Sequence, residues 1–365
     1  MKVPLIDLVR QYHSLKDEID AGLGEVVESG KFIMGPWVGE IEKEISGLMG
    51  AKYGMGVASG TDALEVALRA VNLGPGDEVI TTPFSFVSVA EVALKMGAGC
   101  VFVDIDPRNF NLMPERVKAA ITDKTKAIVP VHLFGQSADM DPINKIAREK
   151  GIPVIEDACQ AIGSGYKGRP VGSLGDMATL SFFPTKNLGC YGDGGMVLTS
   201  DDNLYEYASC IRKHGESERY KYKYIGMNSR LDSIQAAVLL AKVKKIKEWN
   251  EKRRETAAIY EEAFRDIPVE TPFAEEYAYH IYHQYTVKVD KRDELRAFLN
   301  EKGVGNAIHY PLGIQLQEAY APLGYKPGDL PNTEEAAARV LSLPVFPELE
   351  QAEIDYVIST VKEFF

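Results

Sequence analysis

The sequence predicts an α/β fold with a largely parallel, seven-stranded sheet, helices on both faces, and a smaller C-terminal α/β domain. Two patterns lead to this prediction. In the first half of the chain, short β-branched apolar runs alternate with segments whose apolar residues recur every three or four positions. After residue 230 the pattern becomes one long, charged amphipathic stretch, and a shorter alternation follows it. Ligands of parallel sheets bind at the carboxyl ends of the strands, so we expect the chemically active residues there.

The elements follow in order along the chain. The runs expected to be strands of the large sheet are residues 53–59, 78–82, 99–106, 127–133, 153–158, 179–183 and 196–199. The helices expected between them are residues 62–72, 87–96, 114–121 and 140–150. One long helix is expected over 230–264, then strands at 282–289 and 306–310 and helices at 291–302 and 351–364. We place an N-terminal helical segment at 1–30, packed on the small domain, a large domain at 31–245, and the linking helix with the small domain at 246–365.

Composition excludes several classes of protein. The 365 residues are 45% hydrophobic and 26% charged, which suits a globular chain with a sizeable core. Lysine and arginine number 41 against 53 aspartates and glutamates, and the net charge of −12 argues against binding to nucleic acid or to an anionic membrane. The four cysteines form no C-x-x-C pair, so neither a disulfide framework nor a metal site is expected. Since no signal peptide or membrane span is evident, we expect a cytoplasmic protein.

A first candidate site is the turn Ser59-Gly60-Thr61-Asp62, where a strand is expected to end and a helix to begin. Free backbone N–H groups and the positive end of the helix dipole make such a turn suitable for an anion, and Gly60 allows close approach. The same residues are also typical of an ordinary helix N-cap. A phosphate site is therefore one of two interpretations of this motif.

A second candidate is Asp157, at the end of the apolar run 153–157. A carboxylate in such a position is costly unless a cation or strong donor lies beside it. A structural salt bridge would satisfy it, and so would a cationic ligand. Gln160 follows three residues later and is expected to point into the same space.

A third candidate is Lys186, which lies between an apolar strand ending near Ser181 and a glycine-rich loop. Enclosure lowers the pKa of a lysine and yields a neutral amine suited to Schiff-base chemistry. The alternative is a loop lysine whose head reaches solvent. Taken together, the three candidates match pyridoxal phosphate, which needs a lysine for its aldehyde, an acid for its pyridinium nitrogen and an anion site for its phosphate.

These motifs also carry a family resemblance. The turn Ser59-Gly60-Thr61, EDACQA at 156–161, SFFPTKNLGCYGDGG at 181–195 and GMNSRLD at 226–232 are similar to motifs of the DegT/StrS family of sugar aminotransferases. The resemblance extends over nearly the whole chain. It implies a fold type I enzyme that depends on pyridoxal phosphate and aminates nucleotide-linked keto-sugars.

The resemblance implies a role for each matching residue. Lys186 would form the Schiff base and shuttle the proton, and Asp157 would pair with the pyridinium nitrogen. The remaining cofactor contacts would be Gln160 to the ring oxygen, Phe86 stacked on the ring, and Gly60, Thr61 and Ser181 on the phosphate, joined by Asn228 from a neighbouring subunit. Arg230, also from the neighbour, and His309 and Tyr310 would line the sugar site. The active site would thus be shared across a homodimer.

The implied reaction is a ping-pong transfer of an amino group from an amino acid, L-glutamate in the family, to the sugar. The segment His309-Tyr310-Pro311 and the GCYGDGG form resemble enzymes acting on UDP-2-acetamido-2-deoxy-3-keto-glucuronate for surface polysaccharides. A dTDP-3-keto-6-deoxyhexose or a 4-keto sugar is the alternative substrate. Arg230 alone does not distinguish them, because the deoxyhexose enzymes share the NSRLD motif.

Two other classes of protein compete with this interpretation. A nicotinamide dehydrogenase needs a glycine-rich turn after its first strand, and the Ser59-Gly60-Thr61 turn lacks that glycine pattern. A non-catalytic regulator with the cofactor fold would not need Lys186, Asp157 and Gln160 all present.

Overall fold

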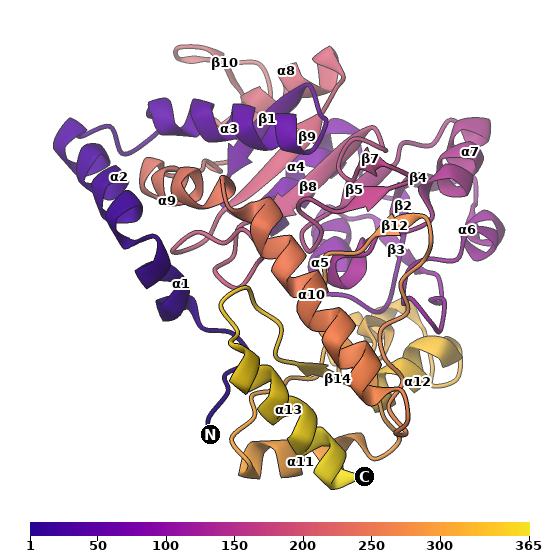
Figure 1. Ribbon diagram of the computed structural model, residues 1–365. Coiled ribbons are helices and arrows are strands. Elements are labelled where there is room, and N and C mark those ends of the chain that lie inside the picture. Colours follow the sequence, from indigo (N-terminus) through magenta and orange to yellow (C-terminus); the bar gives the residue numbers. More distant parts are fainter.

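The central layer of the molecule contains seven strands. In the computed structural model, which describes residues 1–365, a four-stranded sheet has the order β1-β9-β8-β5 and a three-stranded sheet the order β3-β2-β4. The bridges Ile128–Val154 and Val131–Asp157 join β4 to β5 in parallel, so the layer is continuous (Figure 1). The strands are β1 (Tyr53–Val57), β2 (Glu78–Thr81), β3 (Gly99–Phe102), β4 (Thr125–Val129), β5 (Ile155–Asp157), β8 (Met177–Ser181) and β9 (Gly195–Thr199).

The layer is mainly parallel, as predicted. β2 pairs in parallel with β3 and β4, and β5 pairs in parallel with β8. β9 is antiparallel to both of its neighbours, β1 and β8. Because β5 and β8 are parallel, Asp157 and Ser181 end at the same edge of the sheet.

Helices cover both faces of the sheet, and the side chains of the strands alternate between them. Ala178, Leu180 and Leu198 pack with α3 (Pro36–Leu48) and α9 (Ser233–Val243). Met177 and Val197, one residue away, pack on the opposite face with α4, α5 and α8. The remaining helices of this part are α4 (Gly60–Ala70), α5 (Ser88–Lys95), α6 (Pro114–Ala120), α7 (Met140–Lys150) and α8 (Asp202–Ile211).

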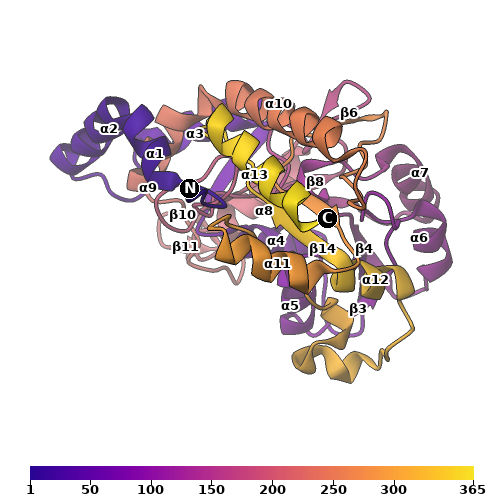
Figure 2. The same ribbon diagram turned by 60° about the horizontal axis from the view of Figure 1, so that its bottom comes forward.

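The long helix expected over 230–264 is two helices. α9 ends at Val243 and α10 (Ile246–Phe264) begins three residues later. At the junction the backbone tightens, and the Lys245 N–H donates to the Lys242 carbonyl at 2.9 Å. α9 stays on the sheet while α10 leads to the C-terminal elements and lies beside α13 (Gln351–Phe364) (Figures 1 and 2).

The C-terminal elements surround a core of their own, to which Val3 also contributes. Its strand pair is β13 (Tyr285–Lys288) with β14 (Val340–Leu343). The strand predicted at 306–310 is wrong: that segment makes one bridge, Ala307 to Ser342, at the edge of β14. Pro311 follows directly and has no N–H to extend the pairing. The other helices here are α11 (Arg292–Glu301), α12 (Pro331–Arg339) and the 3₁₀ turns η2 (Ile314–Leu316) and η3 (Glu318–Leu323).

The N-terminal segment is helical, but only part of it packs on the small domain as expected. Arg10, in α1 (Leu8–Ser14), donates to Glu353 of α13 at 2.7 Å, as a segment on the small domain should. α2 (Lys16–Ser29) instead packs against α9, where Ile19 meets Val238. The domain boundaries stay predictions.

Small elements complete the chain. They are the sheet β12 (Ala278–Tyr279), β6 (Gly165–Tyr166) and β7 (Arg169–Pro170), the hairpin β10 (Glu216–Glu218) and β11 (Lys221–Tyr222), and the turn η1 (Leu133–Gly135). None of the helices combines the length and the apolar character that crossing a bilayer requires.

Candidate active site

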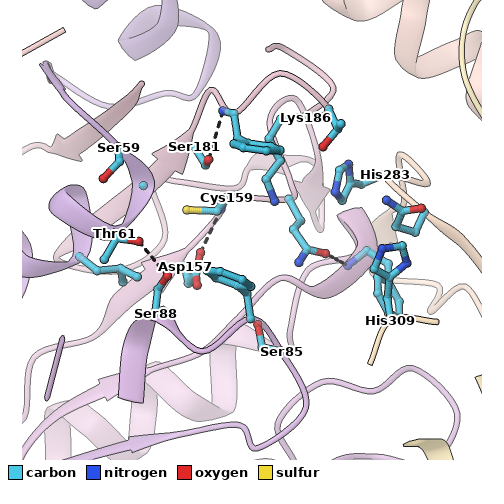
Figure 3. A pocket seen from close by; sticks show the side chains of 18 of the residues that line it. Ser59, Thr61, Ser85, Ser88, Asp157, Cys159, Ser181, Lys186, His283 and His309 are labelled. Carbon is cyan, nitrogen blue, oxygen red and sulfur yellow. Dashed lines mark hydrogen bonds between the residues drawn. The ribbon is translucent and has the colours of Figure 1, made fainter. Parts of the chain in front are cut away.

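A cavity of about 570 Å³ opens at the carboxyl ends of β5 and β8 (Figure 3). Its walls also include the N-terminus of α4, the loop that follows β8, and the segment around His309. The predicted site residues that line it are Gly60, Thr61, Phe86, Asp157, Gln160, Ser181, Lys186, His309 and Tyr310. Residues from distant parts of the chain therefore meet where sheet topology predicts a ligand.

One end of the cavity is suited to an anion. Ser59 caps α4 by accepting the N–H of Asp62 at 3.0 Å, which leaves the N–H groups of Gly60 and Thr61 without a partner in the helix. Thr61 Oγ1 lies 2.9 Å from Ser88 Oγ. A Cβ on Gly60 would lie 2.8 Å from the Cβ of Ser181, so only glycine fits here. Backbone donors, hydroxyls and a helix dipole thus surround a space that fits a phosphate.

Asp157 lines the same cavity at the carboxyl end of β5. Its side chain is 7% exposed, and its Oδ1 accepts the N–H of Cys159 at 3.1 Å. The carboxylate accepts no other backbone N–H, so acceptor capacity remains on the cavity side. A buried carboxylate with unused acceptor capacity suits a cationic N–H donor.

Gln160 is held at both ends of its amide. Its Oε1 accepts the N–H of Phe134 at 2.9 Å, and its Nε2 donates to the hydroxyl of Tyr310 at 3.2 Å. One of the two hydrogens on Nε2 remains for a ligand. Burial raises the pKa of Tyr310 to about 12, so its hydroxyl keeps its proton.

Lys186 faces the same space, and burial lowers its pKa. The charges of Cys159 and Asp157 act in the opposite direction but are smaller. No hydrogen bond to the protein holds its Nζ. The lowered pKa increases the fraction of neutral, nucleophilic amine.

The mouth of the cavity carries Phe86, whose side chain is 60% exposed. An aromatic ring that lines a cavity without core packing is available for stacking. His309 also lines the cavity, and its Nδ1 is 2.9 Å from Ser342 Oγ. Burial lowers the pKa of His309 to about 4, and the charge of Lys186 acts in the same direction.

Two predicted residues lie outside the cavity of this chain. Asn228 is exposed and forms a bridge with Lys213, and Arg230 lines a separate surface hollow with His214 and Tyr222. Lys186 is the only lysine or arginine that lines the cavity.

Further residues of the lining were not predicted, among them Ser85, Ser88, His283 and Gln284. Ser88 starts α5 and faces Thr61. His283 and Gln284 precede β13 in the segment AYHIYHQY, where two histidines and a glutamine interrupt an apolar run. This polar interruption is the sequence feature that could have indicated a site at His283 and Gln284.

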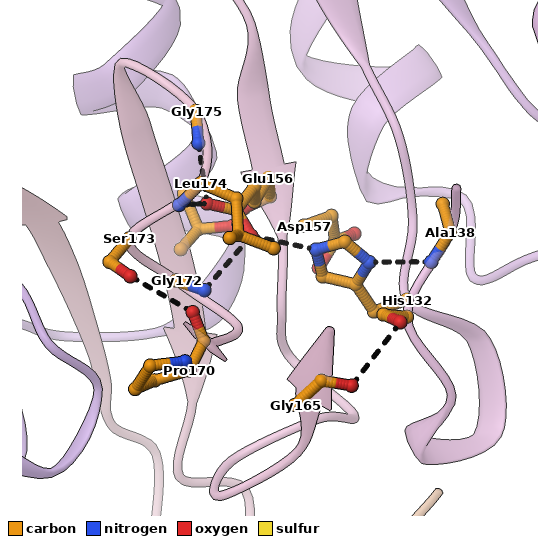
Figure 4. Close-up of polar contacts among 12 residues, drawn as sticks. His132, Ala138, Glu156, Asp157, Gly165, Pro170, Gly172, Ser173, Leu174 and Gly175 are labelled. Carbon is orange, nitrogen blue, oxygen red and sulfur yellow. Dashed lines mark hydrogen bonds and ion pairs between the residues drawn. The ribbon is translucent and has the colours of Figure 1, made fainter. Parts of the chain in front are cut away.

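His132 does not line the cavity and is paired with Glu156, the residue before Asp157 (Figure 4). Its Nδ1 accepts the N–H of Ala138 at 3.0 Å, so the proton is on Nε2, which donates to Glu156 at 2.9 Å. Glu156 also accepts three backbone N–H groups, from Gly172, Leu174 and Gly175. The pair is fully buried, and it fixes Glu156, which precedes Asp157, and His132, whose backbone N–H donates to the Asp157 carbonyl.

The sequence and the fold are similar to those of known proteins. The model of the DegT/DnrJ/EryC1/StrS aminotransferase family matches residues 13–362. The chain belongs to this family. It is an aminotransferase of fold type I, and its cofactor is pyridoxal phosphate, so these expectations are confirmed.

Individual relatives match over their full length. The chain is 51% identical to a "pleiotropic regulatory protein" of Geobacillus stearothermophilus, covering 100% of this chain and 99% of the relative. It is 45% identical to the UDP-2-acetamido-2-deoxy-3-oxo-D-glucuronate aminotransferase of Pseudomonas aeruginosa, covering 98% and 99%. It is 42% identical to the UDP-N-acetyl-3-dehydro-alpha-D-glucosamine 3-aminotransferase of Acidithiobacillus ferrooxidans, covering 99% and 97%.

Solved structures agree with the fold. DesV of Streptomyces venezuelae superposes with a TM-score of 0.97 at 39% identity, covering 100% of this chain and 98% of that one. NtdA of Bacillus subtilis, solved with bound pyridoxamine phosphate, gives a TM-score of 0.93 at 34% identity, covering 99% and 85%.

The cavity itself fits the cofactor. The helix N-terminus suits the phosphate, the Asp157 carboxylate suits the ring nitrogen, and a buried amine faces the space between them. When bound, pyridoxal phosphate supplies an electron sink that stabilises a carbanion on the amino donor.

Proposed function

We propose that the protein transfers an amino group from an amino acid, L-glutamate as the first candidate, to the 3-keto group of UDP-2-acetamido-2-deoxy-3-keto-glucuronate. The relatives at 45% and 42% identity, both named for UDP-linked 3-keto sugars, support this substrate class. The segment His309-Tyr310 at the cavity supports it as well. The product would enter surface polysaccharide synthesis.

The observation that carries the proposal is the meeting of Lys186, Asp157 and the α4 N-terminus around one cavity. In this proposal Lys186 attaches the cofactor and, once released, moves the proton to and from the α-carbon of the donor. Lys186 suits this role because burial lowers its pKa and so raises the fraction of neutral amine. Asp157 keeps the ring nitrogen protonated by accepting its N–H.

The remaining residues would bind and orient. Gln160 donates its free Nε2 hydrogen to the ring oxygen, and Phe86 stacks on the ring. Gly60, Thr61 and Ser181 hold the phosphate through backbone N–H and hydroxyl groups.

We further propose that the active site is completed by a second copy of the chain. A phosphate and a sugar diphosphate carry several negative charges, yet Lys186 is the only cation of the cavity. Asn228 and Arg230, both at the surface, would be supplied by the partner, with Asn228 on the phosphate and Arg230 on the sugar carboxylate.

A regulatory role is the second candidate, because the relative at 51% identity is named a pleiotropic regulatory protein. Retention of Lys186, Asp157 and Gln160 at the cavity favours catalysis instead. A regulator needs to bind the cofactor but has no need of a buried amine.

The test is a panel of amino-sugar nucleotides added to the purified protein while the visible absorbance of the lysine-bound cofactor is recorded. The panel contains 3-amino and 4-amino forms, UDP and dTDP forms, and sugars with and without the C6 carboxylate. Loss of the band with the UDP 3-amino uronate alone is the expected result. Loss only with another sugar would overturn the proposed substrate, and a band that no sugar affects would favour the regulator.

A further inference from the structure

His283 is a buried histidine of the cavity wall that has no role in the proposed reaction. Its side chain is 6% exposed, and its backbone N–H donates to the Phe134 carbonyl at 2.7 Å. It lines the cavity beside Lys186 (Figure 3). What it can do there depends on which of its ring nitrogens carries the proton.

A chain of three hydrogen bonds behind the ring decides this. Asn250 Nδ2 donates to the backbone carbonyl of Ile162 at 3.0 Å, and because a carbonyl only accepts, the orientation of this amide is fixed. Asn250 Oδ1 then accepts from Asn187 Nδ2 at 2.9 Å. Asn187 Oδ1 is left facing His283 Nδ1 at 3.0 Å, so Nδ1 must be the donor.

The chain is built into the core. Asn187 and Asn250 are 4% and 2% exposed. A Cβ on Gly163, whose φ is +81°, would come within 2.7 Å of Asn250 Nδ2, so glycine is needed for this approach. Buried amides that are fully paired in one direction hold a single arrangement.

With the proton on Nδ1, the Nε2 of His283 carries a lone pair. No protein group hydrogen-bonds to Nε2, although it is not a fully enclosed atom. The space open to it is the cavity that His283 lines. Burial, with the charges of Lys186, Arg253 and His309, holds the pKa of His283 well below its usual value, so the ring stays neutral.

Nearby, the Lys186 amine has no hydrogen-bond acceptor in the protein. Asn187, which fixes the ring of His283, is also the next residue in the chain after Lys186. One polar chain therefore anchors both the lysine backbone and the ring that faces its side chain.

We propose that His283 is a positioning residue whose Nε2 accepts a hydrogen bond from Lys186 Nζ whenever that amine is released from the cofactor. Asn187 and Asn250 hold the imidazole in the tautomer that makes Nε2 an acceptor. The inference rests on the proposed role of Lys186. It adds that the side chain of the released lysine is held in one defined position within the cavity.

The first test reads the tautomer directly. In holoenzyme labelled with 15N-histidine, long-range 1H–15N correlations should show the proton of His283 on Nδ1 and none on Nε2 across neutral pH. A proton on Nε2 would overturn the proposal. This measurement needs neither a variant nor turnover.

The second test uses the pyridoxamine phosphate form of the holoenzyme, in which Lys186 is free. Its pKa is measured from the pH dependence of labelling at Lys186, quantified by mass spectrometry. His283→Asn keeps a donor at the place of Nδ1 but removes the acceptor at Nε2. The lysine pKa should fall by about one pH unit, because the ammonium loses its acceptor.

His283→Gln is the matched variant, since its side chain carries an acceptor to the place of Nε2. It should retain a lysine pKa close to that of the unmodified protein. His280→Asn is the control, because His280 lies outside this cavity. An unchanged lysine pKa in His283→Asn would overturn the proposal.

The outcomes separate this inference from the proposed function. If Lys186→Ala retained full aminotransferase activity, the proposed function would fail while the tautomer result stood. If His283→Asn raised only the KM for the sugar and left the lysine pKa unchanged, His283 would be a substrate ligand and the positioning role would be wrong.

Discussion

At the residue scale, the chemistry of the site depends on burial that differs from one side chain to the next. Lys186 is half-buried and has no hydrogen-bond partner, and desolvation lowers its pKa. Cys159, beside it, is half-buried near Asp157, and desolvation raises its pKa well above the usual value. The two shifts favour the neutral form of the amine and the protonated, unreactive form of the thiol in one cavity. The amine is therefore the available nucleophile.

Lys186→Ala should fold and bind the cofactor through the α4 N-terminus, because neither depends on the amine. The visible absorbance of the lysine-bound cofactor should disappear, and transamination should fall by about 1000-fold or more. Absorbance spectra and turnover with the preferred sugar check this. Lys150→Ala, at the exposed end of α7, serves as the control and should match the unmodified protein.

Sequence reasoning succeeded at this scale where a residue lies inside a distinctive local motif. Lys186 and Asp157 follow apolar strands, and their positions were predicted from that pattern alone. His283 and Ser88 were missed because their importance comes from neighbours remote in sequence, Asn187 and Thr61. Local patterns carry no information about such partners.

At the element scale, the ends of strands and helices position the residues of the active site. α4 begins where β1 has just ended, and its first turn meets the end of β8 at Gly60. On the other side of the sheet, Lys242 of α9 donates to the carbonyl of Gly189 at 2.7 Å, in the loop that follows Lys186. Each contact ties a helix to a loop that carries a site residue.

Gly60→Ala should weaken cofactor binding at least tenfold, about 1.4 kcal/mol. The added Cβ would lie 2.8 Å from the Cβ of Ser181 and 3.2 Å from Cys159 Sγ, so the phosphate cradle must shift. Titration of the cofactor-depleted protein with pyridoxal phosphate measures this. Gly47→Ala in α3, where a Cβ meets nothing within 4 Å, should bind the cofactor normally. Equal affinities in the two variants would contradict the crowding argument.

The burial of Lys242 should make the free energy of unfolding depend on pH. Burial lowers its pKa to about 8 from the ordinary lysine value of 10.5. Below pH 8 the lysine is protonated in both the folded and the unfolded state, and between 8 and 10.5 only the unfolded state holds the proton. The free energy of unfolding should therefore rise across this window by about 3 kcal/mol relative to Lys242→Met. Denaturant unfolding of both proteins at several pH values measures the difference, and parallel curves would contradict it.

At the scale of the whole molecule, one chain provides a cavity with a single cation for a ligand that carries several negative charges. Apolar side chains also remain exposed near the α2–α3 turn, among them Phe32 at 45% and Ile33 at 50%. Both features are in keeping with the proposed homodimer, in which Asn228 and Arg230 would complete the partner's site.

Mixing two inactive variants tests that proposal. Lys186→Ala and Arg230→Ala subunits, each inactive alone, should regain activity when unfolded together and refolded as mixed dimers. Half of the dimers would be mixed, and each would contain one intact site of two, so about a quarter of the activity should return. No recovery, with mixed dimers demonstrated by mass spectrometry, would place Lys186 and Arg230 in the same subunit's site.

The sequence by itself determined the alternation of strands and helices, the position of Asp157 at a strand end and of Lys186 in the loop after a strand, and the cofactor, because these depend on local periodicity and on residue types within short motifs. The tertiary structure alone decided that β14 pairs with β13, that residues 306–310 form no strand, and that α9 and α10 are separate helices. It also decided that Asn250, Asn187 and His283 form one hydrogen-bonded chain. Strand partners, helix directions and buried polar networks depend on which distant segments come together, and that is set by packing of the whole chain.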